Sequence, residues 1–199
     1  MGENRERLEK QLGFIRELDK LKTIKRRTYL LDGSRTENSA EHSWQIALMA
    51  LLLLEYGNEK NLDAFRIVKM LLVHDIVEIE AGDTYIYDDQ AALSQHEREE
   101  AAARHLFGLL PEEQRREFED LRREYEEGKS AEGRFARTID RFQPFYHNFL
   151  TEGRAWLEHG ITSDRVKKII KPIGQGSATL GAVADGLLEA AVARGYLGA

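Results

Sequence analysis

The segment from residue 67 to residue 83 most constrains the fold, because it places ionisable residues inside a long apolar stretch. Residues 67–73 read Ile-Val-Lys-Met-Leu-Leu-Val, which is typical of a buried helix, and His74, Asp75, Glu78 and Asp83 follow. Burying an imidazole or a carboxylate is unfavourable unless it is paired or bound to a metal ion. On an α-helix His74 and Glu78 share one face, and Asp75 lies about 100° around the axis from His74. The segment therefore predicts a helical turn that supplies two metal ligands and a nearby acid or base.

Helical periodicity dominates the rest of the chain, and the sequence shows no convincing run of alternating strand residues. We therefore expect an all-α fold. We expect a single domain over residues 1–199, with a core of about 18–150 and a C-terminal helical extension over 151–199. A first amphipathic helix, ending near Lys22, is predicted by Leu8, Leu12, Ile15, Leu18 and Leu21. Later helices are expected at about 39–56, 62–81, 91–109, 111–125, 130–150, 164–171 and 177–194.

The composition excludes several classes of function. The chain of 199 residues has no cysteine, which removes disulfides, thiolate zinc ligands and a cysteine nucleophile. A formal net charge of -6 argues against binding to nucleic-acid polymers or membrane surfaces. The first residues lack an apolar signal core, and the longest apolar run, Ile46 to Leu54, is too short to span a bilayer. A cytoplasmic enzyme or binding protein is the resulting expectation.

A connection rich in cations lies between the first and second predicted helices and includes Arg26, Arg27 and Arg35. It is either a solvated basic loop or a cluster that binds the phosphate of a substrate, since an acidic protein needs local cations to hold one. We expect Arg35 to bind phosphate as well; the alternative is that it pairs with Glu37 or Glu41 to hold the loop.

Side chains able to bind a metal come from three separate predicted helices. His42 lies in the first turn of the second helix, His74 and Asp75 lie in the third, and Asp140 lies in an aromatic helix. Two imidazoles and two carboxylates suit Mn²⁺, Co²⁺, Fe²⁺, Ni²⁺ or Zn²⁺ better than Mg²⁺, which prefers oxygen ligands. Each residue alone has a structural explanation, such as an ion pair between Asp140 and a neighbouring arginine. Together they favour one site for one divalent ion.

The order of these residues resembles the HD-domain metal-dependent phosphohydrolase superfamily, whose ligand pattern is His, then His-Asp, then a distant Asp. Residues 35–43, which read RTENSAEHS, are similar to the small branch of bacterial 5′-deoxynucleotidases. The HDxxExxxGD motif at 74–83 and the segment RFARTIDR at 134–141 are similar to the same branch. The resemblance runs from about Leu18 to Phe145 and implies an HD-domain helical bundle.

By resemblance, one divalent ion is bound by His42, His74, Asp75 and Asp140. Glu78 and Asp83 are the catalytic candidates: Glu78 as general acid or base, and Asp83 as a contact to the sugar of the substrate. The implied reaction is hydrolysis of a phosphate monoester by metal-activated water, with a (deoxy)nucleoside 5′-monophosphate as a candidate substrate. That branch has an Arg-Trp pair before the first motif, whereas this chain has Arg26, Arg27 and Thr28, which leaves the substrate open. The resemblance and the apolar positions on the first and last helices also imply a homodimer.

Two other functions fit the same scaffold. An HD-type di-iron oxygenase needs ligands for a second metal, which would have to come from His96, His105 or His147. His96 and His105 lie nine apart, off a common helical face, and are better explained as surface or hydrogen-bonding residues. The other alternative is a non-catalytic module that binds a metal or a nucleotide, in which Glu78 has no role. One ion per chain and metal-dependent turnover distinguish the hydrolase from both.

Overall fold

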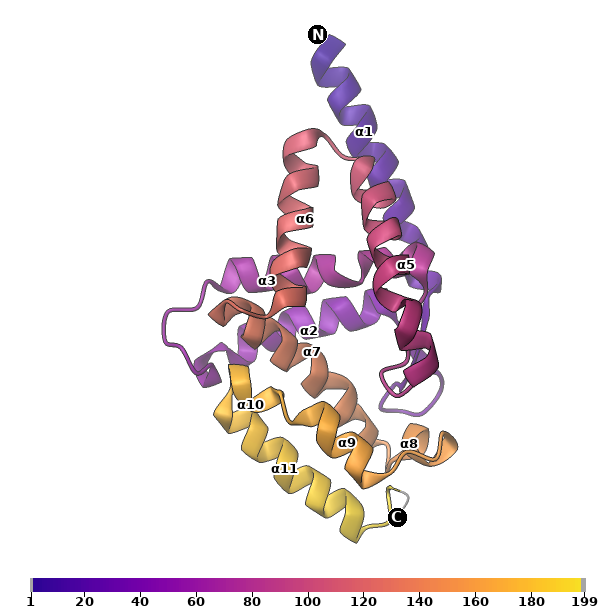
Figure 1. Cartoon of the computed structure of the whole chain (residues 1–199), viewed down its shortest axis with the longest axis vertical. Coiled ribbons are helices and arrows are strands. Elements are labelled where there is room, and N and C mark those ends of the chain that lie inside the picture. The colour runs from indigo at the N-terminus through magenta and orange to yellow at the C-terminus, as the bar shows by residue number, and fades with distance from the viewer. Residues whose placement is uncertain (1, 198–199) are drawn as a thin grey trace.

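The computed structural model describes residues 2–197, and it is dominated by helices (Figure 1). The α-helices are α1 Gly2–Leu18, α2 Ser39–Leu53, α3 Ala64–Val73, α4 Glu78–Ala81, α5 Asp89–Gly108, α6 Glu112–Glu127, α7 Ala131–Leu150, α8 Arg154–Glu158, α9 Ser163–Ile170, α10 Ile173–Gly176 and α11 Ala178–Ala193. Three short 3₁₀ helices are η1 Asp19–Thr23, η2 Leu54–Tyr56 and η3 His74–Val77. The expected all-α class is confirmed.

The basic connection contains a small antiparallel sheet that the sequence analysis did not predict. Strand β1, Lys25–Tyr29, pairs with β2, Thr36–Asn38, and the register is irregular along β1. A strand pair this short leaves too few residues for an alternating pattern to stand out. Gly33 in the turn has a φ of +68°, a conformation that glycine adopts without strain. Because side chains alternate along a strand, Arg26 is half-buried whereas Arg27 is exposed.

Helix α2 begins with a capping box. The side chain of Asn38 accepts a hydrogen bond from the N–H of Glu41 at 2.9 Å, and Glu41 Oε2 accepts one from the N–H of Asn38 at 3.0 Å. These bonds satisfy two amides that the first turn leaves without helical partners. The start of α2 is thereby fixed, and His42 lies in its first turn, fully buried.

The segment around the His-Asp pair is not one continuous α-helix, which corrects the sequence-based expectation. Helix α3 ends at Val73, the 3₁₀ turn η3 follows, and α4 ends before Gly82, whose φ is +74°. A 3₁₀ helix turns about 120° per residue. His74 and Glu78, four apart across this turn, therefore do not share a helical face. The change of geometry still leaves both side chains buried.

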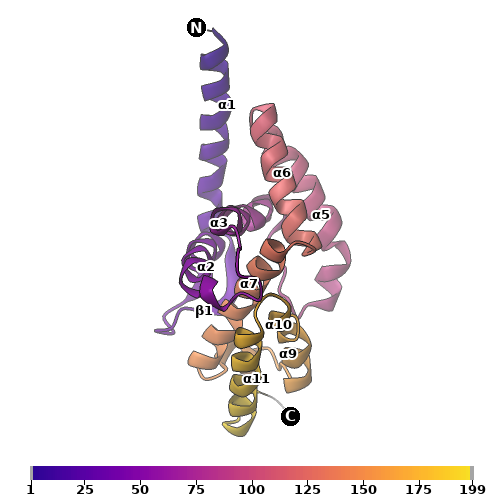
Figure 2. The same ribbon diagram turned by 90° about the vertical axis from the view of Figure 1, so that its left-hand side faces the viewer.

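Helix α7 runs through the centre of the molecule and packs against α3, α6, α10 and α11 (Figure 1). It contains Pro144 and is not interrupted there. Helices α5 and α6 lie toward one end of the molecule and α8–α11 toward the other, and Figure 2 shows α1 projecting beyond the body. The hydrophobic core joins both ends, since it includes Met70, Phe135 and Trp156. Among the described residues, no helix is both long and apolar enough to cross a membrane.

Candidate metal centre and adjoining cavity

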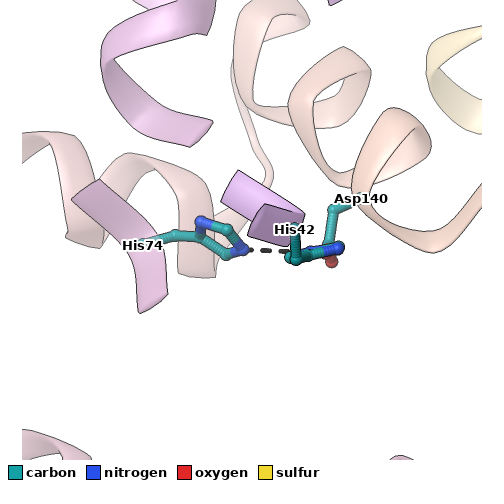
Figure 3. Close-up of side chains that lie close together, drawn as sticks. All are labelled: His42, His74 and Asp140. Carbon is teal, nitrogen blue, oxygen red and sulfur yellow. Dashed lines mark hydrogen bonds and ion pairs between the residues drawn. The ribbon is translucent and has the colours of Figure 1, made fainter. Parts of the chain in front are cut away.

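His42, His74 and Asp140 converge from α2, η3 and α7 (Figure 3). Nε2 of His42 lies 3.0 Å from Oδ1 of Asp140, and Nε2 of His74 lies 3.6 Å from the same oxygen. One potential ligand atom from each of the three lies within 4.8 Å of the others. Asp75 adjoins them, with Oδ1 3.0 Å from His74 Nε2 and Oδ2 3.9 Å from His42 Nε2. The structure therefore brings together all four ligands that the sequence suggested.

Both imidazoles are oriented by hydrogen bonds on the nitrogen that faces away from the centre. Nδ1 of His74 donates to the backbone carbonyl of Leu71 at 2.9 Å, and Nδ1 of His42 donates to Oε1 of Gln143 at 3.0 Å. Such bonds fix the tautomer and leave the Nε2 lone pairs directed at the centre, as in known metal sites.

Further polar residues around the ligands were missed by the sequence analysis. Gln143 donates from Nε2 to Oε2 of Glu37 at 2.9 Å and to Oε1 of Gln45 at 2.9 Å. The hydroxyl of Tyr125 donates to Oδ2 of Asp140 at 2.6 Å. Gln143 follows Asp140 by three residues on α7, so helical spacing was the signal that could have identified it.

The electrostatics of the cluster favour a positive charge at its centre. Burial lowers the pKa of His74, but Asp75 and Asp140 outweigh it and hold that pKa well above its ordinary value. Burial raises the pKa of Asp140, but hydrogen bonds from His42 and His74 lower it by a larger amount. The pKa of Asp140 therefore lies well below its ordinary value. Protons on the rings or a metal cation supply the charge. Imidazole nitrogens with carboxylate oxygens are a donor set that fits a divalent transition metal.

Arg26 reaches from β1 into the same region and contacts several carboxylates. Its Nη1 lies 3.1 Å from Asp75 Oδ2, 3.6 Å from Asp83 Oδ1 and 3.9 Å from Glu78 Oε1. Its Nε lies 3.3 Å from Oε1 of the buried Glu37. Burial lowers the pKa of Arg26, but these four carboxylates raise it more, so the guanidinium stays charged.

Glu78 and Asp83, the two catalytic candidates, lie beside this arginine. Ser39 at the start of α2 donates from Oγ to Oε2 of Glu78 at 2.5 Å, a contact that the sequence analysis did not anticipate. Burial, together with the charge of Asp75, raises the pKa of Glu78 well above its ordinary value. Burial also raises the pKa of Asp83, although Arg26 partly offsets it. Both carboxyl groups therefore lie in surroundings that favour holding a proton.

A cavity of about 290 Å³ opens beside the cluster, and its lining includes most of the predicted site residues: Arg26, Arg27, His74, Asp75, Glu78, Asp83 and Asp140. Arg35 is not part of this lining. Its guanidinium instead binds both oxygens of Glu41, at 2.8 and 2.6 Å, next to β2. The geometry of Arg35 favours the interpretation in which it holds the loop.

The three histidines considered for a second metal, His96, His105 and His147, are not members of the close group of potential ligands. His105 is exposed and donates from Nδ1 to Oε1 of Glu80 at 2.6 Å, and His96 is also exposed. His147 is buried, with Nδ1 3.4 Å from the carbonyl oxygen of Tyr29. Within residues 2–197 no second group of three close metal-binding side chains forms around them. Nothing in this arrangement favours a di-iron centre.

Known protein sequences are similar to this chain. A family model described as HD domain matches residues 18–180. The human 5′-deoxynucleotidase HDDC2 is 33% identical over 130 residues, which cover 65% of this chain and 62% of that protein. The 5′-deoxynucleotidase YfbR of Escherichia coli is 35% identical over 119 residues, which cover 56% of this chain and 59% of YfbR. The chain therefore spans less than two thirds of the length of these curated relatives.

Solved structures extend the similarity over nearly the whole chain. A crystal structure described as a predicted metal-dependent phosphohydrolase from Magnetospirillum magnetotacticum is 51% identical, with a TM-score of 0.93. The match covers 97% of this chain and 96% of that one. A conserved hypothetical protein from Pyrococcus furiosus is 21% identical with a TM-score of 0.62, covering 91% of this chain and 98% of the other. At that identity the second match shows the fold alone.

Proposed function

Because this chain belongs to the HD domain family, we propose that it is a metal-dependent phosphohydrolase that cleaves a phosphate monoester. The observation that carries the proposal is the meeting of His42, His74, Asp75 and Asp140 beside a cavity that Arg26 and Glu78 also line. The relatives named above as a metal-dependent phosphohydrolase and as 5′-deoxynucleotidases support the same activity.

We propose that these four side chains hold one divalent ion, with Mn²⁺, Co²⁺, Fe²⁺, Ni²⁺ or Zn²⁺ favoured over Mg²⁺. When bound, such an ion polarises a phosphate oxygen and lowers the pKa of water. The protein's own part is to preorganise the donors. Gln143 and the carbonyl of Leu71 orient the two imidazoles, and Tyr125 orients Asp140.

We assign the remaining steps to residues of the cavity. Arg26 lies within 4 Å of carboxylates on both sides of the centre, so a phosphate group placed there is within reach of its fork of N–H donors. Glu78, held by Ser39, takes a proton from the attacking water or returns one to the leaving alcohol. Asp83 contacts the sugar, and Arg27 adds charge at the exposed side of the cavity. Arg35 is left out of this set because it is bound to Glu41.

The substrate class that we favour is a (deoxy)nucleoside 5′-monophosphate, as the names of the relatives suggest. The test is a screen of phosphorylated metabolites, each with Mn²⁺, Co²⁺ and Mg²⁺ in turn, with released phosphate as the readout. Ribonucleotides and deoxyribonucleotides of each base are included as pairs. Phosphate release that depends on the metal supports the proposal. A protein that binds one ion per chain and releases phosphate from no monoester would contradict it.

We also propose that the protein forms a homodimer. Apolar side chains are exposed on α1 and on α2: Leu8, Leu12, Ile15, Trp44, Leu51 and Leu52. Val183 and Val192 are exposed on α11. Trp44 is 63% exposed, and exposed apolar surface can mark an association site. Light scattering after size exclusion should show a dimer that Trp44→Glu shifts toward monomer, whereas Leu93→Glu on α5 leaves it unchanged.

The domain division and the location of the protein are further proposals. We propose one domain over residues 1–199, supported by the ring of Trp156 in the C-terminal part, whose centre lies 5.7 Å from that of Phe145. Limited proteolysis should then yield no stable fragment that ends near residue 150. A cytoplasmic location is our prediction from the sequence, and cell fractionation tests it.

A further inference from the structure

Two arginines of α7 line the metal-centre cavity but take no part in the reaction proposed above. Arg137 and Arg141 lie four residues apart, so their side chains share one face of the helix. The cavity reaches them on the side of Asp140 and Tyr125, whereas Arg26 enters from the hairpin. The cavity therefore has a cationic wall in addition to the arginine that we assign to the phosphate.

The two arginines differ in what they contact. Arg137 donates from Nη1 to the carbonyl oxygens of Tyr125, at 3.3 Å, and of Glu126, at the C-terminal end of α6. Arg141 is half-buried, and within the described part of the chain its guanidinium makes no hydrogen bond and no ion pair. Arg141 is therefore an available set of donors on the cavity wall.

The nearest carboxylates do not neutralise Arg141. The two oxygens of Asp140 are taken by the histidines and by Tyr125. Glu126 also lines the cavity and faces both arginines, but it forms no ion pair with either among the described residues. A guanidinium that is partly removed from water and lies beside a like charge is stabilised by an anion.

A second cavity, of about 180 Å³, is lined by the same two arginines. Arg134 also lines it, and its one acidic lining residue, Glu127, is 3.1 Å from the ammonium group of Lys129. The arginine pair therefore borders two cavities and is reachable by a ligand.

We propose that Arg141, with Arg137 beside it, is a second anion subsite that binds a phosphate on the leaving group of the substrate. The substrate class is then a phosphate monoester whose alcohol part carries a further phosphate, such as a nucleoside bisphosphate. A guanidinium binds phosphate through two parallel hydrogen bonds, which lysine cannot reproduce. The inference rests on the proposed phosphohydrolase function, because it assigns one phosphate to the metal centre.

The test compares two substrates that differ only in the second phosphate, adenosine 5′-monophosphate and adenosine 3′,5′-bisphosphate. The measured quantity is the ratio of kcat/KM for the bisphosphate to that for the monophosphate. We expect the intact protein to prefer the bisphosphate and Arg141→Gln to lower the ratio roughly 10- to 100-fold, the range for hydrogen bonds to a charged group. Arg141→Lys should keep part of the preference, because the charge remains. Arg104→Gln is the control, because Arg104 is exposed on α5 and lines neither cavity, and it should leave the ratio unchanged.

Three results would overturn the subsite: no preference in the intact protein, an equal loss for both substrates in Arg141→Gln, or an equal fall of the ratio in Arg104→Gln. Calorimetric binding of the two nucleotides to protein in EDTA separates this inference from the proposed function. Tighter binding of the bisphosphate that depends on Arg141, without hydrolysis of any ester, supports the subsite and contradicts the phosphohydrolase. Hydrolysis of a monoester without tighter binding of the bisphosphate supports the phosphohydrolase and contradicts the subsite.

Discussion

Replacing Gln143 by leucine tests whether the metal centre depends on the residues that orient its ligands. Gln143 is fully buried, and its carbonyl oxygen holds Nδ1 of His42 while its amide group bonds Glu37 and Gln45. Leucine has a similar volume and no polar atoms. The change therefore leaves His42 in place but removes the bond that fixes its tautomer and its ring orientation.

The expected effect has two parts. Loss of a residue that orients a metal ligand weakens metal affinity by about 10- to 100-fold, or about 1.4–2.7 kcal/mol. The buried groups left without a partner on His42 and Glu37 lower the free energy of unfolding by about 1–3 kcal/mol each. The metal-free protein should therefore melt at a lower temperature, and the variant should also gain less stability from added metal than the original protein does.

Competition with a fluorescent chelator measures the Zn²⁺ or Mn²⁺ affinity, and thermal melts with and without metal measure the stability. Gln45→Leu is the matched control. It removes the hydrogen bond between Gln143 and Gln45 but keeps the one between Gln143 and His42. Gln45→Leu should keep the original metal affinity. If Gln143→Leu binds metal as tightly as the original protein despite a lower melting temperature, Gln143 stabilises the fold alone and our account of the ligand orientation is refuted.

Asp75→Ala should abolish metal binding and turnover together, as elemental analysis and a phosphate assay would show, because the centre loses a charged ligand. Glu78→Ala should keep the metal and lose roughly 10²- to 10⁴-fold in kcat, the share of general acid–base catalysis; a metal-free variant would mean that Glu78 is a ligand. Arg35→Lys should leave kcat and KM unchanged and lower the thermal stability slightly, by less than about 1 kcal/mol for an exposed pair. A rise in KM would instead indicate that Arg35 binds the phosphate of the substrate. The hydrogen bond from Arg35 lowers the pKa of Glu41 from 4.5 to about 2. Because the folded value is the lower one, the stabilisation is complete above pH 4.5 and is lost as the pH falls toward 2. Glu41→Gln should remove this part of the acid dependence in unfolding curves followed by circular dichroism.

The amino-acid sequence alone was enough to predict the helical class and to single out the four side chains that meet at the candidate metal centre. Helices form from local periodicity, so the helix that carries His42 was predicted to begin where α2 begins. His42, His74, Asp75 and Asp140 stood out because polar side chains in apolar helices need partners. The separation of histidines into the cluster and the surface also followed from spacing, as the exposed His105 shows.

The features that the sequence left open depend on contacts between distant parts of the chain. Arg26 and Arg35 lie in the same basic connection, and only the hairpin turns Arg26 toward Asp75, 49 residues away, while Glu41 binds Arg35. Gln143 contacts His42, which is 101 residues away in the sequence, and no local sequence pattern indicates such a contact. The change from α to 3₁₀ geometry at His74 is likewise set by packing, because the same residues are equally compatible with a straight α-helix. Local sequence therefore specifies which side chains are available for chemistry, and tertiary packing specifies which of them face one another.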